Sequence, residues 1–246
     1  MKKIILAIAA LAISCAAFAQ DREIDLERWD DLNKVELSKG GSRVETDLSF
    51  AFPMYFGWTA MTNVNYKGEW AAVYAASSDF LDFNTGKNFV YGLQLVDANL
   101  RYGALGLSIG LRWTFMDFTF KNSNVTFGEY GRYYLPTFIM DPSYNGRKSK
   151  IHASYFGIPA RLSLNAGKFT IYGGGSVEIL TNGYAKYKFP KNRTQMKPLF
   201  NQFRATVEGG FSYGNLGVYV QYGLTPLFPA DLSDARTLTF GLLLGL

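Results

Sequence analysis

Cysteine and histidine are almost missing from this sequence. Among 246 residues there is one cysteine, Cys15, and one histidine, His152. Because Cys15 lies in a segment that we expect to be removed, the mature chain has no thiol for a disulfide or for a cysteine-ligated metal site. The sequence also contains no phosphate-binding glycine loop, metal-ligand cluster or nucleotide fingerprint. We therefore expect no cofactor and no metal.

Long apolar runs and a strong charge bias are missing as well. Residues 209–230 carry no charge, but glycines, Asn215, Gln221 and Pro226 interrupt this stretch, which excludes a membrane-spanning helix there. Without Lys2 and Lys3, 23 basic residues stand against 20 acidic ones. So small an excess does not indicate binding to nucleic acid.

The first 19 residues have the parts of a secretory signal peptide. They comprise a positive end, an apolar core at residues 4–14 and an A-x-A cleavage site at residues 17–19. We expect cleavage before Gln20. Lipoprotein processing at Cys15 is the alternative, although Ala12 occupies the position where such sites usually have leucine.

Residues 20–43 are rich in charges of both signs and end in Gly40 and Gly41. We interpret this segment as a solvated periplasmic extension. The alternative is a short helix that binds a partner.

From residue 44 to residue 246 the chain alternates between apolar and less apolar residues with a period of two, which is typical of β-strands. The clearest case is residues 202–224, where two alternating runs flank a tight turn at Gly214 and Asn215. The pattern predicts strands at 44–57, 88–102 with a bulge near Gly92, 105–120, 150–164, 168–183, two within 202–224, and one after residue 235.

The connections between these strands alternate between long and short. Long loops are expected at residues 58–87, 121–149 and 184–201, a shorter proline-containing loop at 225–235, and tight turns between the other pairs. Outer-membrane barrels show this asymmetry, with long loops outside and short turns at the periplasm. We therefore predict an all-β fold, an eight-stranded antiparallel transmembrane barrel in up-and-down meander order with a short periplasmic extension.

The less apolar face of these strands consists mostly of glycine, serine and threonine. A soluble barrel would instead place many lysines and glutamates on its outer face, so this face is expected to line a narrow lumen. It also carries charges of both signs, which we predict to form a salt-bridged interior plug. A selective pore is the alternative. The predicted network comprises Asp97, Arg101, Arg112, Arg161, Glu178, Arg204 and Glu208.

The predicted third loop is basic and contains no acidic residue. Its cations are expected to bind the phosphates of lipopolysaccharide through charge-assisted hydrogen bonds, with a merely solvated loop as the alternative. Arg147, Lys148 and Lys150 add to the positive charge nearby. The predicted binding residues are Lys186, Lys188, Lys191, Arg193 and Lys197.

His152 and Ser154 form an H-x-S pair that is similar to the pair of outer-membrane lipid A deacylases. Both side chains are expected on one strand face near the outer leaflet. No carboxylate that would orient the imidazole is evident nearby in the sequence, and Glu178 is expected to face the lumen. We therefore predict no catalytic residue.

Four segments resemble the PorT-like outer-membrane β-barrel family of Gram-negative bacteria. They are FLDFNTGKN at 80–88, KSKIHASYFGIPARLSL at 148–164, KFTIYGGGSV at 168–177 and GNLGVYVQYGLTPLF at 214–228. The resemblance implies a barrel in the outer membrane. The members of this family include a factor associated with protein secretion. Leu246 departs from the pattern, because such chains often end in phenylalanine or tryptophan.

Together these features predict a non-enzymatic outer-membrane protein with a structural or partner-binding role in the cell envelope. Its expected partners are outer-membrane lipid, lipopolysaccharide and envelope or secretion-complex proteins. A small-molecule channel and a lipid-modifying enzyme are the alternatives.

Overall fold

The computed structural model describes residues 35–39, 42–49, 53–74, 78–131, 133–188 and 190–245. The predicted signal peptide and the first part of the predicted extension lie outside these residues.

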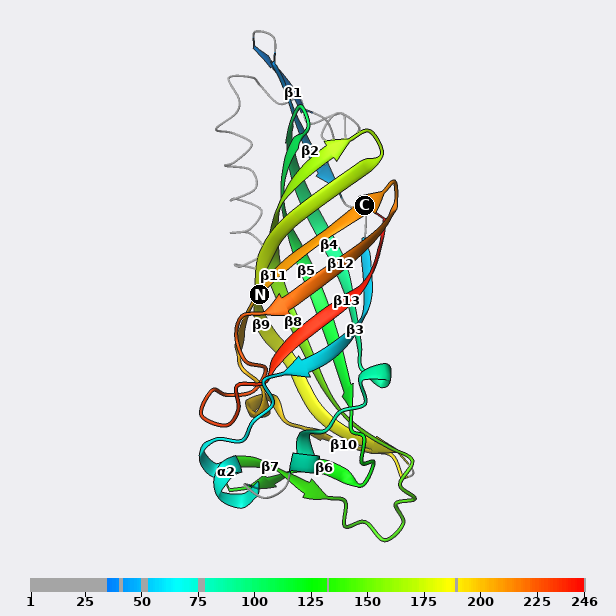
Figure 1. The fold of residues 1–246 in the computed structure, drawn as a ribbon, viewed down its shortest axis with the longest axis vertical. Helices are drawn as coiled ribbons and strands as arrows, with labels where there is room; N and C mark the ends of the chain where they lie inside the picture. Colours follow the sequence, from blue (N-terminus) through cyan, green and yellow to red (C-terminus); the bar gives the residue numbers. More distant parts are fainter. Residues whose placement is uncertain are drawn as a thin grey trace, which may run out of the picture.

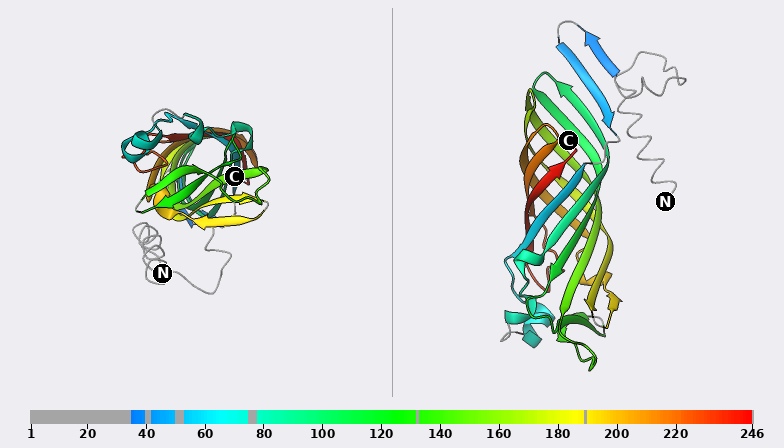
Figure 2. Two further views of the ribbon diagram at one scale, coloured as in Figure 1. Left: turned by 90° about the horizontal axis from the view of Figure 1, so that it is seen from below. Right: turned by 90° about the vertical axis from the view of Figure 1, so that its right-hand side faces the viewer.

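Eight antiparallel strands form a closed barrel in sequential order, as predicted (Figure 1). Each strand pairs with the next, and β13 returns to β3 through a register that runs from Arg236 opposite Thr62 to Leu244 opposite Met54. The view along the axis shows the resulting ring (Figure 2). The barrel strands are β3 (Met54–Thr62), β4 (Phe89–Tyr102), β5 (Leu105–Thr119), β8 (Lys148–Ala166), β9 (Phe169–Lys188), β11 (Phe203–Tyr213), β12 (Leu216–Gly223) and β13 (Arg236–Leu244).

The first predicted strand is divided in two. Strand β2 (Ser42–Ser49) pairs with the last residues of β4, from Asp97 to Tyr102. The barrel strand β3 begins only after Pro53. Proline has no backbone N–H and interrupts a strand ladder, which explains a break at this point. Strand β3 then continues to Thr62, beyond the predicted end at residue 57.

The predicted extension contains an unforeseen strand. Strand β1 (Val35–Lys39) forms a hairpin with β2 at the end of the barrel that carries the short turns (Figure 1). The alternative of a short helix is therefore wrong for residues 35–39. The bulge expected near Gly92 is a register shift between Gln94 and Val96.

The long loops contain regular structure that the sequence did not indicate. They gather at the other end of the barrel, where they form a cap (Figure 1). The cap elements are α2 (Gly68–Tyr74), η2 (Ser78–Leu81), η3 (Thr85–Lys87), β6 (Val125–Tyr130), β7 (Tyr133–Phe138), β10 (Asn192–Gln195) and η4 (Lys197–Leu199).

Trp70 is the centre of the cap. Its side chain is fully buried, its Nε1 donates a hydrogen bond to the Tyr134 carbonyl oxygen at 2.9 Å, and its ring lies 5.6 Å from Phe127 and 5.1 Å from Phe228. The same apolar cluster includes inward-facing side chains of the barrel such as Tyr155. The cap therefore packs into the mouth of the barrel and closes it.

The two faces of the barrel wall differ sharply in polarity. Leu107, Val218 and Leu242 are 38%, 37% and 42% exposed on the outside, whereas Arg112 and Glu208 are buried inside. This polarity is expected for a barrel that crosses a membrane and is the reverse of that in a soluble barrel. Among the described residues, no helix has the length and apolarity needed to span a membrane.

Replacement of Trp70 by alanine should open the cap and leave the barrel intact. Truncating a buried tryptophan typically costs about 3–5 kcal/mol, and here the lost contacts lie within the cap. Limited proteolysis of the protein in vesicles should cut the loops of Trp70→Ala and spare the strands. Val64→Ala, at a 42% exposed loop position, is the control. Equal resistance of both variants to protease would contradict the packing described for the cap.

Candidate functional site

Five buried charges form a continuous chain inside the barrel. Arg112 lies at its centre, with its Nη1 2.7 Å from a Glu208 oxygen and its Nη2 3.3 Å from a Glu178 oxygen. Arg161 Nε lies 2.5 Å from the second oxygen of Glu208, and Arg204 Nη1 lies 2.6 Å from that of Glu178. Positive and negative groups thus alternate along the chain, so that each carboxylate is shared by two guanidinium groups.

Glycines provide the space for these long side chains. Gly157 lies opposite both Arg112 and Glu178 in the strand registers, and Gly174 lies opposite Arg161 and Glu208. A Cβ atom at Gly157 would lie 2.5 Å from Glu178 Cγ, which is too close for any real side chain. The narrow lumen therefore accommodates the charges because the residues beside them have no side chain.

Hydroxyl and amide groups complete the coordination of the carboxylates. Ser176 Oγ donates to Glu178 at 2.8 Å, and Gln221 Nε2 donates to Glu208 at 3.1 Å. Arg204 also donates to Thr237 Oγ1 at 3.1 Å. A buried ion pair is costly unless its remaining donors and acceptors are satisfied, and these neighbours serve that purpose for the carboxylates. Arg112 Nε and Arg161 Nη2, by contrast, have no hydrogen-bond partner among the described residues.

The other two residues of the predicted network are Asp97 and Arg101. Asp97 is buried on the inner face. Arg101 is exposed at the end of β4, where its Nε donates to the Gly103 carbonyl oxygen at 3.1 Å. The prediction for Arg101 was therefore wrong, because the short turn beyond the ring gives its side chain access to solvent.

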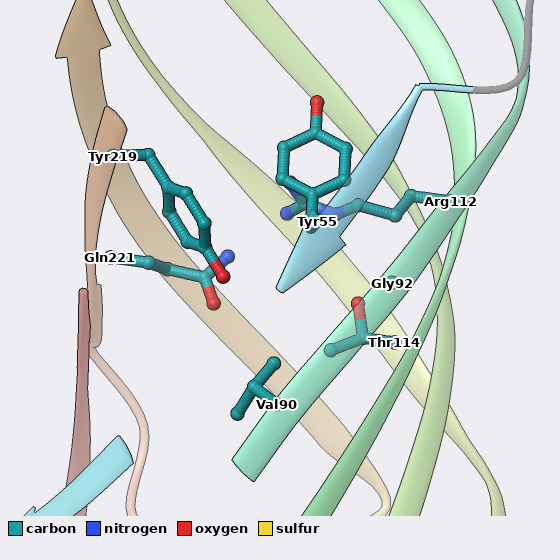
Figure 3. A pocket seen from close by; sticks show the side chains of 7 residues that line it. All are labelled: Tyr55, Val90, Gly92, Arg112, Thr114, Tyr219 and Gln221. Atoms are coloured by element: carbon teal, nitrogen blue, oxygen red, sulfur yellow. The ribbon is translucent and has the colours of Figure 1, made fainter. Parts of the chain in front are cut away.

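Tyrosines fill the lumen on one side of the charged chain. The Arg112 and Arg161 guanidinium groups lie 5.2 Å and 5.3 Å from the centre of the Tyr55 ring, and Arg161 lies 5.4 Å from that of Tyr172. Between Tyr55, Tyr219 and Arg112 a cavity of only about 10 Å³ is left (Figure 3). That volume holds about one water molecule. Sequence reasoning missed this layer because tyrosine also fits a lipid-facing position.

Cations gather on the outer face of the wall beside the cap. In the strand registers Lys150 lies directly opposite Lys186, Lys186 lies opposite Arg193, and Lys148 lies opposite Lys188. Like charges in directly opposed positions destabilise a sheet, so this arrangement favours a bound anion. We call Lys148, Lys150, Lys186, Lys188 and Arg193 the rim cations.

The rim cations repel one another. Burial lowers the pKa of the Lys186 ammonium, and the positive charges of Lys150, Lys191, Lys188 and Arg193 lower it further. Lys191, from the predicted set, thus lies close to this group. Lys197 is exposed at the start of η4, beyond the β9–β10 hairpin.

His152 has the carboxylate partner that the sequence did not reveal. Its Nδ1 donates to Asp117 Oδ1 at 2.8 Å, and Lys150 Nζ lies 2.6 Å from the other oxygen. Asp117 lies on β5, directly opposite His152 in the register. The imidazole also stacks on Tyr184 at 4.5 Å, and Arg193 lies 3.9 Å from the centre of that ring.

Ser154 shares the outward face of β8 with His152, but it is engaged elsewhere. Its side chain is 2% exposed, and its Oγ lies 2.9 Å from Thr181 Oγ1. Across the described residues, no three histidine, cysteine or acidic side chains come together in a way that could hold a metal ion.

Comparison with known proteins gives a likeness of fold. No protein-family model and no curated protein sequence matches the chain. The PorT-like assignment therefore stays a prediction. Among solved structures, the crystal structure of neisserial surface protein A (NspA) is similar at a TM-score of 0.39 and 10% identity, covering 81% of this chain and 99% of that one. We draw no functional conclusion from so distant a likeness, and the barrel follows from the strand pairing itself.

Glu208→Gln should destabilise the barrel strongly. The change removes the negative charge shared by Arg112 and Arg161, and breaking a buried ion pair from one side costs about 3–5 kcal/mol. Urea unfolding in lipid vesicles, followed by the electrophoretic shift between folded and unfolded barrel, measures the loss. Glu129→Gln, at an exposed position of β6, should change stability by less than about 0.5 kcal/mol. Equal stability of the two variants would show that the network contributes little.

Proposed function

We propose that this protein is a sealed outer-membrane barrel that serves the cell envelope as a structural element or binding platform, without enzymatic activity. The observation that carries the proposal is the filling of the lumen. Tyrosines, the charged chain and the apolar cap follow one another along the axis, and the cavity between Tyr55 and Arg112 holds only about 10 Å³.

The outer surface supports a location in a membrane. Exposed apolar side chains cover every barrel strand, among them Phe56, Leu162, Val177 and Phe240 at 43%, 67%, 64% and 51% exposure. So large a continuous apolar surface is stable in hydrocarbon and aggregates in water. The predicted signal peptide directs the chain across the inner membrane, which leaves the outer membrane as the compartment where a β-barrel inserts.

If the lumen is sealed, the barrel should carry no ionic current. The purified protein in planar bilayers should show no unitary conductance steps, whereas a porin reconstituted in the same way should show them. The physical reason is that ions cannot cross a lumen in which about one water molecule fits beside Tyr55. Steps at the wild-type protein that scale with salt concentration would instead establish the channel alternative.

The rim cations support binding of lipid phosphates by the platform. They stand on the outward face directly beyond an aromatic row in which Trp113, Phe115 and Tyr91 stack at 5.3 Å and 5.0 Å. Aromatic rings of this kind mark the boundary between hydrocarbon and headgroups. Ammonium and guanidinium groups just above that boundary are at the level of lipopolysaccharide phosphates.

Lys186→Gln combined with Arg193→Gln should weaken this binding. Each charge-assisted hydrogen bond contributes about 1.5–3 kcal/mol, so the double variant should retain at least about tenfold less lipopolysaccharide after detergent extraction. Phosphate analysis of the purified protein measures the difference. Lys168→Gln, at an exposed turn on the opposite end, is the matched control. Equal retention by both variants would leave the rim without a lipid partner.

One observation favours a second candidate, a lipid-modifying enzyme. Asp117 orients His152 as a carboxylate orients the base of a hydrolase. Against it, the imidazole is 7% exposed beneath Tyr184, and the Ser154 hydroxyl is engaged by Thr181. The lipid composition of membranes that carry His152→Ala separates the two: an unchanged profile supports the platform, and a lost modification supports the enzyme.

The PorT-like resemblance supports a further partner, a protein of an envelope or secretion complex. Crosslinking in intact membranes followed by purification under denaturing conditions tests this expectation. A defined secretion component recovered with the wild-type chain supports the scaffold role, and recovery of lipid alone limits the platform to lipid.

A further inference from the structure

A second cationic feature lies between the cap and the barrel wall. It is a cavity of about 340 Å³, within the range of about 300–1,000 Å³ that ligand sites occupy. It is far larger than the cavity in the lumen. Its lining consists of Asn84, Lys87, Thr119, Phe120, Lys121, Ser123, Arg147 and Lys148.

The charge of this cavity is strongly positive. Lys87 ends η3, Lys121 follows β5, and Arg147 and Lys148 stand where β8 begins, so three separate chain segments each bring a cation. Among the described residues that line the cavity there is no carboxylate. Asp82, just outside the lining, pairs with Lys121 at 2.8 Å. The lining itself thus holds four cations and no carboxylate.

The positive field also acts on Lys148. Burial lowers the pKa of its ammonium, and the charges of Lys150 and Lys188 lower it further. The carboxylate of Asp117 raises it, and Lys87 lowers it by a smaller amount. Holding such a group charged among like charges costs free energy in the empty protein. A bound anion reverses that cost, which is the usual electrostatic logic of an anion site.

The frame of the cavity is rigid. The backbone N–H of Asn84 donates to the Thr119 carbonyl at 2.8 Å, that of Phe120 to Ser149 at 3.1 Å, and that of Lys121 to Asp82 at 2.9 Å. The Phe120 ring stacks on Phe83 with centres 4.8 Å apart. Because these contacts fix the segments before any ligand arrives, little ordering is required on binding.

Neutral groups in the lining suit a sugar. The Asn84 amide offers both a donor and an acceptor, and the Ser123 and Thr119 hydroxyl oxygens keep lone pairs beyond the bonds they donate to Gly146 and Lys87. Sugar hydroxyls need such mixed partners.

We propose that this cavity binds a phosphorylated saccharide, with the phosphate group between Lys87, Arg147 and Lys148 and the sugar hydroxyls on Asn84 and Ser123. A phosphate monoester carries about −1.5 to −2 charges, which matches several cations better than a single carboxylate does. The guanidinium group of Arg147 offers the paired donors that phosphate oxygens accept. The saccharide is either the phosphorylated sugar of a surface glycolipid or a soluble sugar phosphate.

This inference goes beyond the proposed function. The rim cations engage lipid phosphates on the outer wall, whereas the cavity takes a sugar between the cap segments. Lys148 belongs to both, so a test must use residues that belong to one only. Lys87 and Arg147 are exposed residues of the cavity, and Lys186 and Arg193 belong to the rim.

The test is a calorimetric titration of the full-length protein in a non-ionic detergent. Glucose 6-phosphate is the soluble probe, and glucose is its uncharged control. In a second arm, purified lipopolysaccharide is compared with the same material after enzymatic removal of its phosphates. The variants are Lys87→Gln/Arg147→Gln for the cavity and Lys186→Gln/Arg193→Gln for the rim, each checked for folding by its electrophoretic shift.

We expect at least one phosphorylated probe to bind more than about tenfold more tightly than its uncharged control, since each charge-assisted hydrogen bond lost costs about that factor or more. The cavity variant should lose this preference, and the rim variant should keep it toward glucose 6-phosphate. A preference confined to lipopolysaccharide that the cavity variant loses identifies the glycolipid as the source, and one shared by both probes identifies the free sugar phosphate as well.

The inference is overturned if no phosphorylated probe is preferred, or if the cavity variant binds as the wild type does. Failure of the sealed-barrel proposal would be visible separately, as conductance in planar bilayers, so the two outcomes can be told apart.

Discussion

The structure depends on mutual compensation of buried charges in a lumen too narrow for bulk water. Arg112 joins Glu178 to Glu208, and each of these carboxylates holds a further arginine. The pairing permits ionised groups inside the wall, and the glycines opposite them, such as Gly157 and Gly174, permit their bulk. Because the charges come from β5, β8, β9 and β11, their pairing also joins strands that are distant in sequence and fixes the wall at one circumference.

Different kinds of side chain fill the two ends of the barrel. Tyrosines and apolar side chains fill the lumen near the short turns, where the strands leave little room. At the opposite end Trp70, Phe127 and Phe228 bring the loops into one apolar cluster. The cations therefore have no place in the interior there and stand on the outer wall and around the cavity beside the cap. A filled interior and a cationic rim follow from the same division of side chains.

The strands were predictable from sequence because a period of two fixes both the conformation and the face of each residue. In contrast, the contacts between non-neighbouring segments were not. The register of β5 against β8 sets Asp117 beside His152, yet a long connection separates these strands, and no turn geometry fixes their offset in the sequence. Similarly, Trp70 is one aromatic residue in a stretch without periodicity. Its burial at the centre of the cap comes from packing between loops that are distant in sequence. The break before β3 was signalled by Pro53 and was missed.

Strands β8 and β9 have 19 and 20 residues, whereas a membrane crossing requires about 9–11. At about 3.3 Å per residue and a tilt near 45°, strands of this length rise roughly 45 Å, enough to traverse the hydrocarbon and both headgroup layers. The loop cluster built around Trp70 consequently stands clear of the bilayer. Because these loops pack as one apolar cluster, this end of the molecule presents a single compact surface beyond the strands.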